Sequence, residues 1–144
     1  MSARNINDTP GRRLAGGAFA FLRAAELLHE SDPASWAWAT CFVNIGFALE
    51  LGLKGFLRER GFSEEEQVAI GHDLSKAFYA ATARGFKPSH PLQRPLMDEL
   101  SPHFKKMSLR YLDGSWVDLP AISDAIIVAR LLILDVHEQC GFVR

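Results

Sequence analysis

The chain has few cysteines. Its 144 residues include two, Cys41 and Cys140, and both lie in apolar stretches with helical periodicity. Thiols in such surroundings are usually buried and unreactive, and so few of them are typical of a protein that stays reduced. We therefore expect two inert thiols and a cytoplasmic location.

Motifs of metal, redox and nucleotide chemistry are missing. The sequence contains no HExxH, CxxC or GxSxG pattern and no glycine-rich phosphate-binding loop. Each of these patterns supplies the ligands, thiols or nucleophile on which its reaction depends. Zinc, redox and nucleoside-triphosphate chemistries are therefore poorly supported, and we expect neither a metal nor a cofactor.

An excess of one charge sign is also missing. Sixteen Lys and Arg against seventeen Asp and Glu leave a formal net charge of −1, so the overall charge favours neither nucleic acid nor a membrane as a partner. The first residues, MSARNINDTPGRR, lack the apolar core of a signal peptide, and we expect no membrane-spanning segment after them. Any attraction to phosphates must then be local.

Apolar residues, by contrast, are abundant. Hydrophobic types make up 48% of the sequence, which suits one compact domain with a sizeable core and leaves no room for a second. We expect a flexible tail over residues 1–11 and a single helical-bundle domain over residues 12–144. The three Trp and ten Phe exceed what so small a bundle needs, which favours a homodimer.

Recurring apolar residues predict an all-α fold. Helices are expected over residues 13–30, 34–60, 63–84 with a break at Gly71, 91–100, and about 120–140. A short irregular or extended segment precedes the last helix, and Asp118 is placed to cap that helix at its N-terminus.

Polar side chains interrupt the apolar faces of the second predicted helix and of the GHDL stretch. Glu50 and Lys54 stand four residues apart, in the order that favours an ion pair on a helix. We expect Gly71 to break the chain's helical path so that the residues after it turn toward this pair. The predicted polar network comprises Glu50, Lys54, His72, Asp73 and Arg110. A structural role and a role in a functional site both stay open for it.

A basic segment spans residues 84–110. It holds six Lys or Arg against two acids, a net charge of +4, whereas the rest of the chain carries −5. Such a segment is suited to phosphate contacts, and a solvated basic loop is the alternative. The candidate RNA-binding residues are Lys87, Arg94, Lys105 and Lys106, with His90, His103 and Arg110 nearby.

The last predicted helix places two polar groups on an apolar side. Arg130 and His137 stand seven residues apart and fall within about 20° of each other on a helical wheel. Groups in such a sector need partners, a cleft or a subunit interface. Asp124, Asp135 and Glu138 gather on another side, which we expect to face solvent.

Several stretches of the sequence resemble the HEPN domains, a family of small all-helical proteins of prokaryotic defence and toxin–antitoxin systems. They are FALELGLKGFL, GHDLSKAFYAATARG, LRY at residues 109–111, and RLLILDVH on the final helix. The resemblance implies an antiparallel up-and-down bundle of four to five helices that dimerises. In active members it implies a metal-independent endoribonuclease, and the Arg and His of that motif match Arg130 and His137.

The chemistry of such a pair needs no metal. His137 would take the proton from a 2′-hydroxyl that attacks the adjacent phosphate, and Arg130 would stabilise the charge on the phosphoryl oxygens. Active members usually carry a polar residue directly after the motif Arg, whereas Leu131 follows it here. Two functions stay open. One is a helical interaction module of a two-component defence or toxin–antitoxin system, with a protein or single-stranded RNA as partner, and the other is a dimeric ribonuclease.

Overall fold

The fold is all-α, as the sequence predicts. The computed structural model describes residues 8–31, 37–106 and 119–142, and within these ranges it contains six helices and no strand. The helices are α1 (Pro10–Ser31), α2 (Trp38–Glu59), α3 (Glu64–Ile70), α4 (Leu74–Ala83), α5 (Gln93–Lys106) and α7 (Ile122–Cys140).

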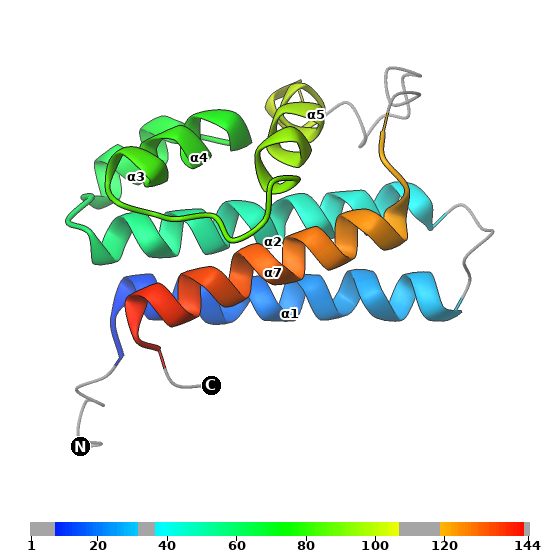
Figure 1. Cartoon of the computed structure of the whole chain (residues 1–144), viewed down its shortest axis with the longest axis horizontal. Coiled ribbons are helices and arrows are strands. Elements are labelled where there is room, and N and C mark those ends of the chain that lie inside the picture. The colour runs from blue at the N-terminus through cyan, green and yellow to red at the C-terminus, as the bar shows by residue number, and fades with distance from the viewer. Residues whose placement is uncertain (1–7, 32–36, 107–118, 143–144) are drawn as a thin grey trace.

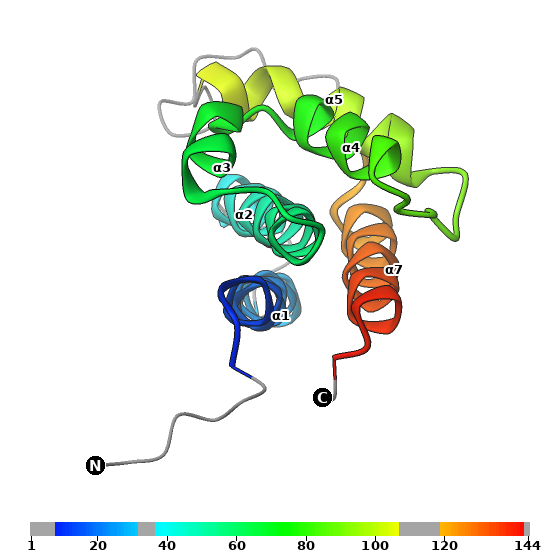
Figure 2. The same ribbon diagram turned by 90° about the vertical axis from the view of Figure 1, so that its left-hand side faces the viewer.

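Three long helices form the base of the molecule. α1 and α2 lie side by side and run in opposite directions, and α7 packs against both of them (Figures 1 and 2). α1 and α2 approach closely through small residues, because a Cβ atom added to Gly55 would lie 2.7 Å from the carbonyl oxygen of Gly11. Glycine at this position therefore sets the distance between the two backbones.

The short helices cover the other side of α2. α4 packs against α2 and α5, and α5 lies across the long helices, so it is seen lengthwise in Figure 2 where they are seen nearly end-on. Phe104 of α5 lies directly over Gly46 of α2, where an added Cβ would lie 1.7 Å from the ring. The core between these layers is aliphatic and aromatic, and its largest fully buried side chains include Leu49, Phe56 and Phe78.

Helix α2 is central, because it contacts every other described helix. It is also long and apolar enough to cross a membrane by length and composition, with a mean hydropathy of 1.3 over its most apolar window. From the sequence we expected no membrane-spanning segment. In the fold 72% of that window is buried, and buried core helices of soluble proteins commonly have this composition.

Several helix boundaries differ from the predicted ones. α1 begins at Pro10, and Gly11 is buried, so the last two residues of the predicted tail belong to a packed helix. α7 begins at Ile122 after an extended Ala121 that makes no side-chain cap bond, later than predicted. Asp118, the predicted cap, lies outside the described residues. Pro120 disfavours helical geometry in the residue before it, which agrees with the non-helical conformation of Leu119.

Candidate functional site

The joint between α3 and α4 positions the first group of candidate residues. Ser63 and Glu66 form both bonds of a capping box and start α3, a helix of seven residues that Gly71 terminates as its C-cap. Gly71 has φ +61° and ψ −136°, a backbone conformation that residues other than glycine rarely adopt. The chain therefore turns at Gly71, which brings His72 back over α2 before Asp73 opens α4.

His72, Glu50 and Lys54 come together at this joint. Nδ1 of His72 lies 2.7 Å from Oε1 of Glu50, and Nζ of Lys54 lies 3.3 Å from Oε2 of the same carboxylate. Lys54 also donates to the carbonyl oxygen of Gly71 at 2.7 Å. The Glu50 and Lys54 side chains are 9% and 8% exposed, whereas that of His72 is 47% exposed. The buried ion pair of Glu50 and Lys54 is thus hydrogen-bonded to one half-exposed imidazole, that of His72.

The chemistry of this group follows from its hydrogen bonds. A carboxylate accepts, so Nδ1 of His72 carries the proton it shares with Glu50, and in the neutral ring Nε2 is then an acceptor. An imidazole oriented by a buried carboxylate is a common arrangement for a base or a ligand. The same bonds also join α2 to the turn before α4, which is a structural task in its own right.

Asp73 does not join this group. Its carboxylate caps α4 by accepting from the backbone N–H of Lys76 at 3.0 Å, and it also accepts from the Ser101 hydroxyl at 3.0 Å. Burial alone would raise the pKa of Asp73, but these hydrogen bonds and the charge of Lys105, 3.8 Å away, lower it overall. The prediction that Asp73 turns toward Glu50 is wrong, because its side chain is hydrogen-bonded to the first turn of α4 as the N-cap.

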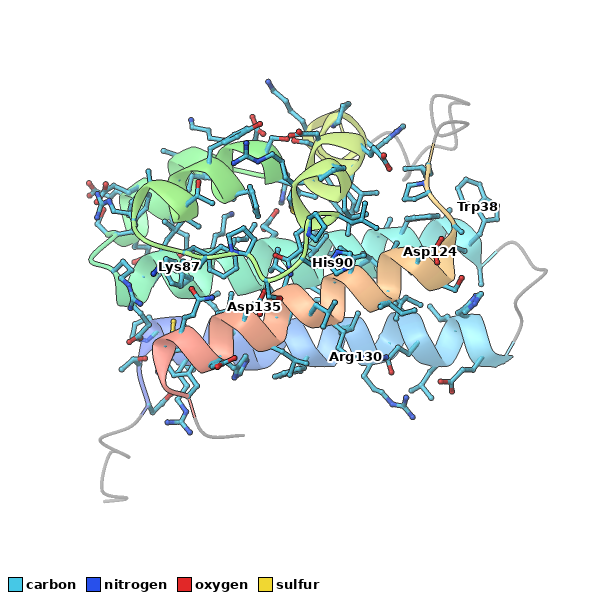
Figure 3. All side chains as sticks on the ribbon, viewed as in Figure 1. Trp38, Lys87, His90, Asp124, Arg130 and Asp135 are labelled. Carbon is cyan, nitrogen blue, oxygen red and sulfur yellow. The ribbon has the colours of Figure 1, made fainter. Side chains whose placement is uncertain are left out.

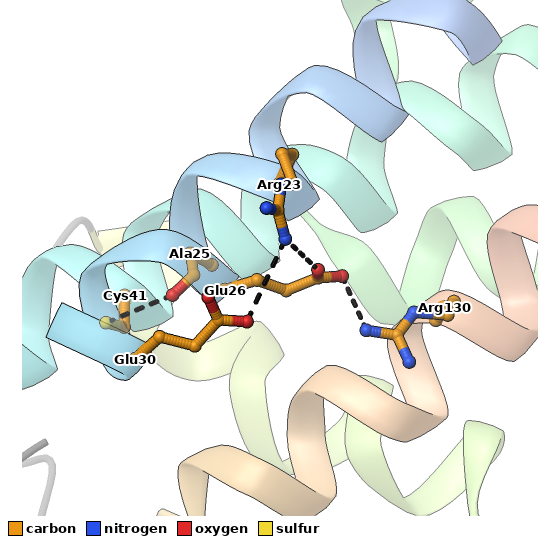
Figure 4. Close-up of polar contacts among 6 residues, drawn as sticks. All are labelled: Arg23, Ala25, Glu26, Glu30, Cys41 and Arg130. Atoms are coloured by element: carbon orange, nitrogen blue, oxygen red, sulfur yellow. Dashed lines mark hydrogen bonds and ion pairs between the residues drawn. The ribbon is translucent and has the colours of Figure 1, made fainter.

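Arg130 pairs with helix α1. Its guanidinium donates to Oε1 of Glu26 at 2.6 Å, and Arg23 donates to the other carboxylate oxygen at 3.1 Å (Figure 4). Burial opposes ionisation of Glu26, but the hydrogen bonds from Arg130 and Arg23 and their charges lower its pKa overall. The Arg130 side chain is 45% exposed. It therefore sits at the edge of the contact between α7 and α1.

His137 lies deeper in the same contact. It is 6% exposed, and its Nε2 lies 3.0 Å from the carbonyl oxygen of Ala15. A carbonyl only accepts, so Nε2 carries the proton. The ring packs against Phe19 at 4.5 Å and Phe142 at 5.6 Å between centroids. Nδ1 is buried and has no hydrogen-bond partner among the described residues.

Arg130 and His137 are therefore on one side of α7 but in separate surroundings. Seven residues of helix separate their Cα atoms by about 10 Å along the axis. The first is held by the carboxylate of Glu26 and the second by the backbone of Ala15 and two phenyl rings. Within the single chain the two side chains do not converge on one point.

The predicted RNA-binding residues spread over a wide surface. Lys87 lies on the loop after α4, and its backbone N–H and C=O pair with the side-chain amide of Gln139 at 2.9 and 2.7 Å. Arg94 is exposed and lies over the rings of Phe78 and Tyr79. Lys105, 69% exposed, stands near Asp73. The side chain of Lys106 and all of Arg110 lie outside the described residues, and His103 is buried.

Asp135 is a residue that the helical wheel misplaced. It is 7% exposed rather than on the solvent face, and its Oδ2 accepts from the Ser89 backbone N–H at 3.0 Å and from Gln93 Nε2 at 2.9 Å. Figure 3 shows it on α7 beside the loop that carries Lys87 and His90. Asp135 thus ties this loop and the start of α5 to α7, whereas Asp124 is exposed as predicted.

Metal ligands and reactive thiols are the remaining candidates for chemistry. In residues 8–31, 37–106 and 119–142, no three His, Cys, Asp or Glu side chains are grouped so that they could hold a metal ion. Cys41 is buried and donates to the carbonyl oxygen of Ala25, and burial raises its pKa. Burial raises the pKa of Cys140 to about 11, so both thiols are protonated near neutral pH.

Comparison of the chain with known protein families, with curated protein sequences and with solved structures gives no match in any of the three.

Proposed function

We propose that the chain is a HEPN-like helical interaction module, with the antiparallel up-and-down bundle that this resemblance implies. It acts in the cytoplasm as a homodimer and as one half of a two-component defence or toxin–antitoxin system, and it binds single-stranded RNA without cleaving it. The observation that carries the choice of a module over a nuclease is the engagement of both candidate catalytic side chains within the chain.

A general base must reach the proton that it removes. His137 is 6% exposed and covered by Phe19 and Phe142, and the proton on its Nε2 is already donated to Ala15. Arg130 would have to exchange the carboxylate of Glu26 for a phosphate. These contacts stabilise the pairing of α7 with α1, and they favour a binding role.

A homodimer is supported by the outer face of α7. Ile127 is 53% exposed, and the side chains at Leu131 and Leu134, one and two turns further on, are partly exposed. Positions 127, 131 and 134 follow helical spacing, so they form one apolar stripe. A second copy of the chain is the occupant that we propose for this stripe, since most soluble oligomers pair identical surfaces.

One observation favours the metal-independent endoribonuclease as the second candidate. The buried Nδ1 of His137 has no partner among the described residues, so it offers a free lone pair of the kind that a base needs. Should opening of the turn at Phe142 expose this atom to RNA, His137 and Arg130 would act as the resemblance implies.

Incubation of the purified protein with single-stranded RNA in EDTA separates the two candidates. We expect a labelled oligonucleotide to be bound, with its length unchanged on a denaturing gel. Cleavage that is retained in EDTA and abolished in His137→Ala, at unchanged circular dichroism, would replace the module by the nuclease. Since a positioned base contributes about 10²- to 10⁴-fold, this effect is easily measured.

A further inference from the structure

Three cationic residues from separate parts of the chain lie at one end of the molecule. Arg60 follows α2, Arg84 follows α4, and Lys87 lies on the next loop, close to the C-terminal end of α7. These helix ends lie together in Figure 1, and Figure 3 places Lys87 above α7. Arg60 and Lys87 are 27 positions apart in the sequence, so only the fold brings them together.

A chain of hydrogen bonds links the three residues through Gln139. Arg84 donates to the carbonyl oxygen of Arg60 at 3.1 Å, and Arg60 donates to the carbonyl oxygen of Gln139 at 3.2 Å. The side-chain amide of Gln139 then pairs with the backbone of Lys87. We call Arg60, Arg84 and Lys87 the basic platform.

Aromatic rings hold the two guanidinium groups in place. The Cζ atom of Arg60 lies 4.5 Å from the centre of the Phe56 ring, and that of Arg84 lies 4.7 Å from the centre of the Phe62 ring. A guanidinium carries five N–H donors, and each of these two uses one of them in a bond to a carbonyl. Both residues are exposed, so donors are left over on side chains whose positions are already set.

The platform differs in its ion pairing from five other described cations. Arg13, Arg23, Lys54, Lys105 and Arg130 each lie within 4.0 Å of an acidic side chain. In the described part of the chain, none of the three platform cations has such an ion pair. The C-terminal ends of α2, α4 and α7 lie beside these residues, and each carries about −0.5 charge. Together they offset only about half of the combined positive charge of Arg60, Arg84 and Lys87.

We propose that the basic platform binds phosphate groups of single-stranded RNA. This inference rests on the proposed RNA binding and says where it occurs. Arginine matches phosphate oxygens through its planar fork, and pre-set side chains lose less entropy on binding. Lys105 is not part of the site, because its ammonium already stands beside Asp73.

The test is the affinity of the full chain for a labelled twelve-nucleotide oligouridylate, measured by fluorescence anisotropy over a range of salt concentrations. The variant Arg60→Gln with Arg84→Gln should bind roughly tenfold more weakly. Its log–log salt slope should fall by about 1.4, because each phosphate of a single strand that a cation neutralises contributes about 0.7 to the slope. Lys105→Gln is the matched control, and its affinity should stay within about twofold of the original.

A second variant separates charge from folding. Arg60→Lys with Arg84→Lys keeps both charges, so its salt slope should equal that of the original chain. An unchanged affinity and slope in the glutamine variant, with RNA still bound, overturns the platform and leaves the RNA-binding proposal standing. The platform is also overturned if the lysine variant is weakened as much as the glutamine variant.

If the chain binds no RNA even at low salt, the RNA-binding proposal is refuted. RNA is then also refuted as the ligand of the basic platform. Titration with tripolyphosphate, followed through the arginine Nε–H signals in NMR spectra, then tests the anion site by itself. Shifts of the Arg60 and Arg84 signals support a phosphate site for another ligand. Unchanged signals overturn the site.

Discussion

Nδ1 of His72 and Oε1 of Glu50 lie 2.7 Å apart, across 22 positions of the sequence. The bond joins a half-exposed imidazole to a carboxylate that is almost fully buried and that also holds Lys54. Buried charges are tolerated where they are paired and hydrogen-bonded, so His72 helps to make the charge of Glu50 compatible with the core.

Removal of the imidazole should destabilise the fold. His72→Ala deprives Oε1 of Glu50 of its hydrogen bond, and we expect a decrease of about 1–3 kcal/mol in the free energy of unfolding, measured by urea denaturation. In a Glu50→Gln background the same substitution should cost less, because the two residues share one interaction. Equal costs in both backgrounds would show that His72 acts independently of Glu50.

The cap of α4 should respond to acid. The pKa of Asp73 is lowered in the folded chain, so its contribution is complete above the ordinary pKa of an aspartate and is lost as the pH falls through the lower folded value. Asp73→Ala should cost about 1 kcal/mol at pH 7 and less at lower pH. Asp73→Asn keeps a capping oxygen and should cost less at pH 7. A destabilisation that grows as the pH falls would contradict this assignment.

Asp135 and Asp124 lie on the same helix, α7, but only Asp135 is buried, so Asp124 provides a control for its replacement. Asp135→Ala removes the acceptor of the Ser89 N–H and strands the buried amide of Gln93, at roughly 1–3 kcal/mol for the buried donor. Asp124 is exposed, and its replacement by Ala should change stability by no more than about 0.5 kcal/mol. Thermal unfolding distinguishes the two variants. Similar melting temperatures for both would show that Asp135 does not hold the loop before α5 against α7.

Two glycines of the long helices should respond in opposite ways to alanine. A Cβ on Gly55 would collide with the Gly11 backbone, whereas one on Gly16 meets nothing within 4 Å. Gly55→Ala should lower the free energy of unfolding by roughly 1–3 kcal/mol or more, the cost that is typical of overpacking. Gly16→Ala should stabilise by about 0.5–1 kcal/mol, because alanine is the better helix former. Both changes are measured by urea denaturation, and tolerance of alanine at position 55 would mean that α1 and α2 can move apart.

The proposed homodimer predicts a light-scattering mass of two chains at micromolar concentration. Ile127→Arg should shift the mass to one chain, because a charge on the apolar stripe must be desolvated in the interface. Val68 is 68% exposed on α3, and Val68→Arg is the matched control that should leave the dimer intact. A monomeric original chain would remove the dimer from the proposal.

Local patterns in the sequence determined much of the helical structure. The capping box of Ser63 and Glu66 and the break at Gly71 need only neighbouring residues, and the break occurs as predicted. The meeting of Glu50 and Lys54 follows from a spacing of four residues on one helix. These features depend on backbone geometry within one or two turns, which the order of residues already contains.

Only the tertiary structure decided which polar groups are free and which are bound. A helical wheel gives the direction of Asp135 but not the loop that covers it, and the partner of Arg130 is Glu26, 104 positions away. Asp73 was equally able to face Glu50 or cap α4, and the position of Ser101 on α5 favours the second. Long-range contacts of this kind depend on how whole helices pack. The burial of His137 and the common contact of Arg60 and Lys87 with Gln139 were therefore decided by the fold rather than by any local pattern.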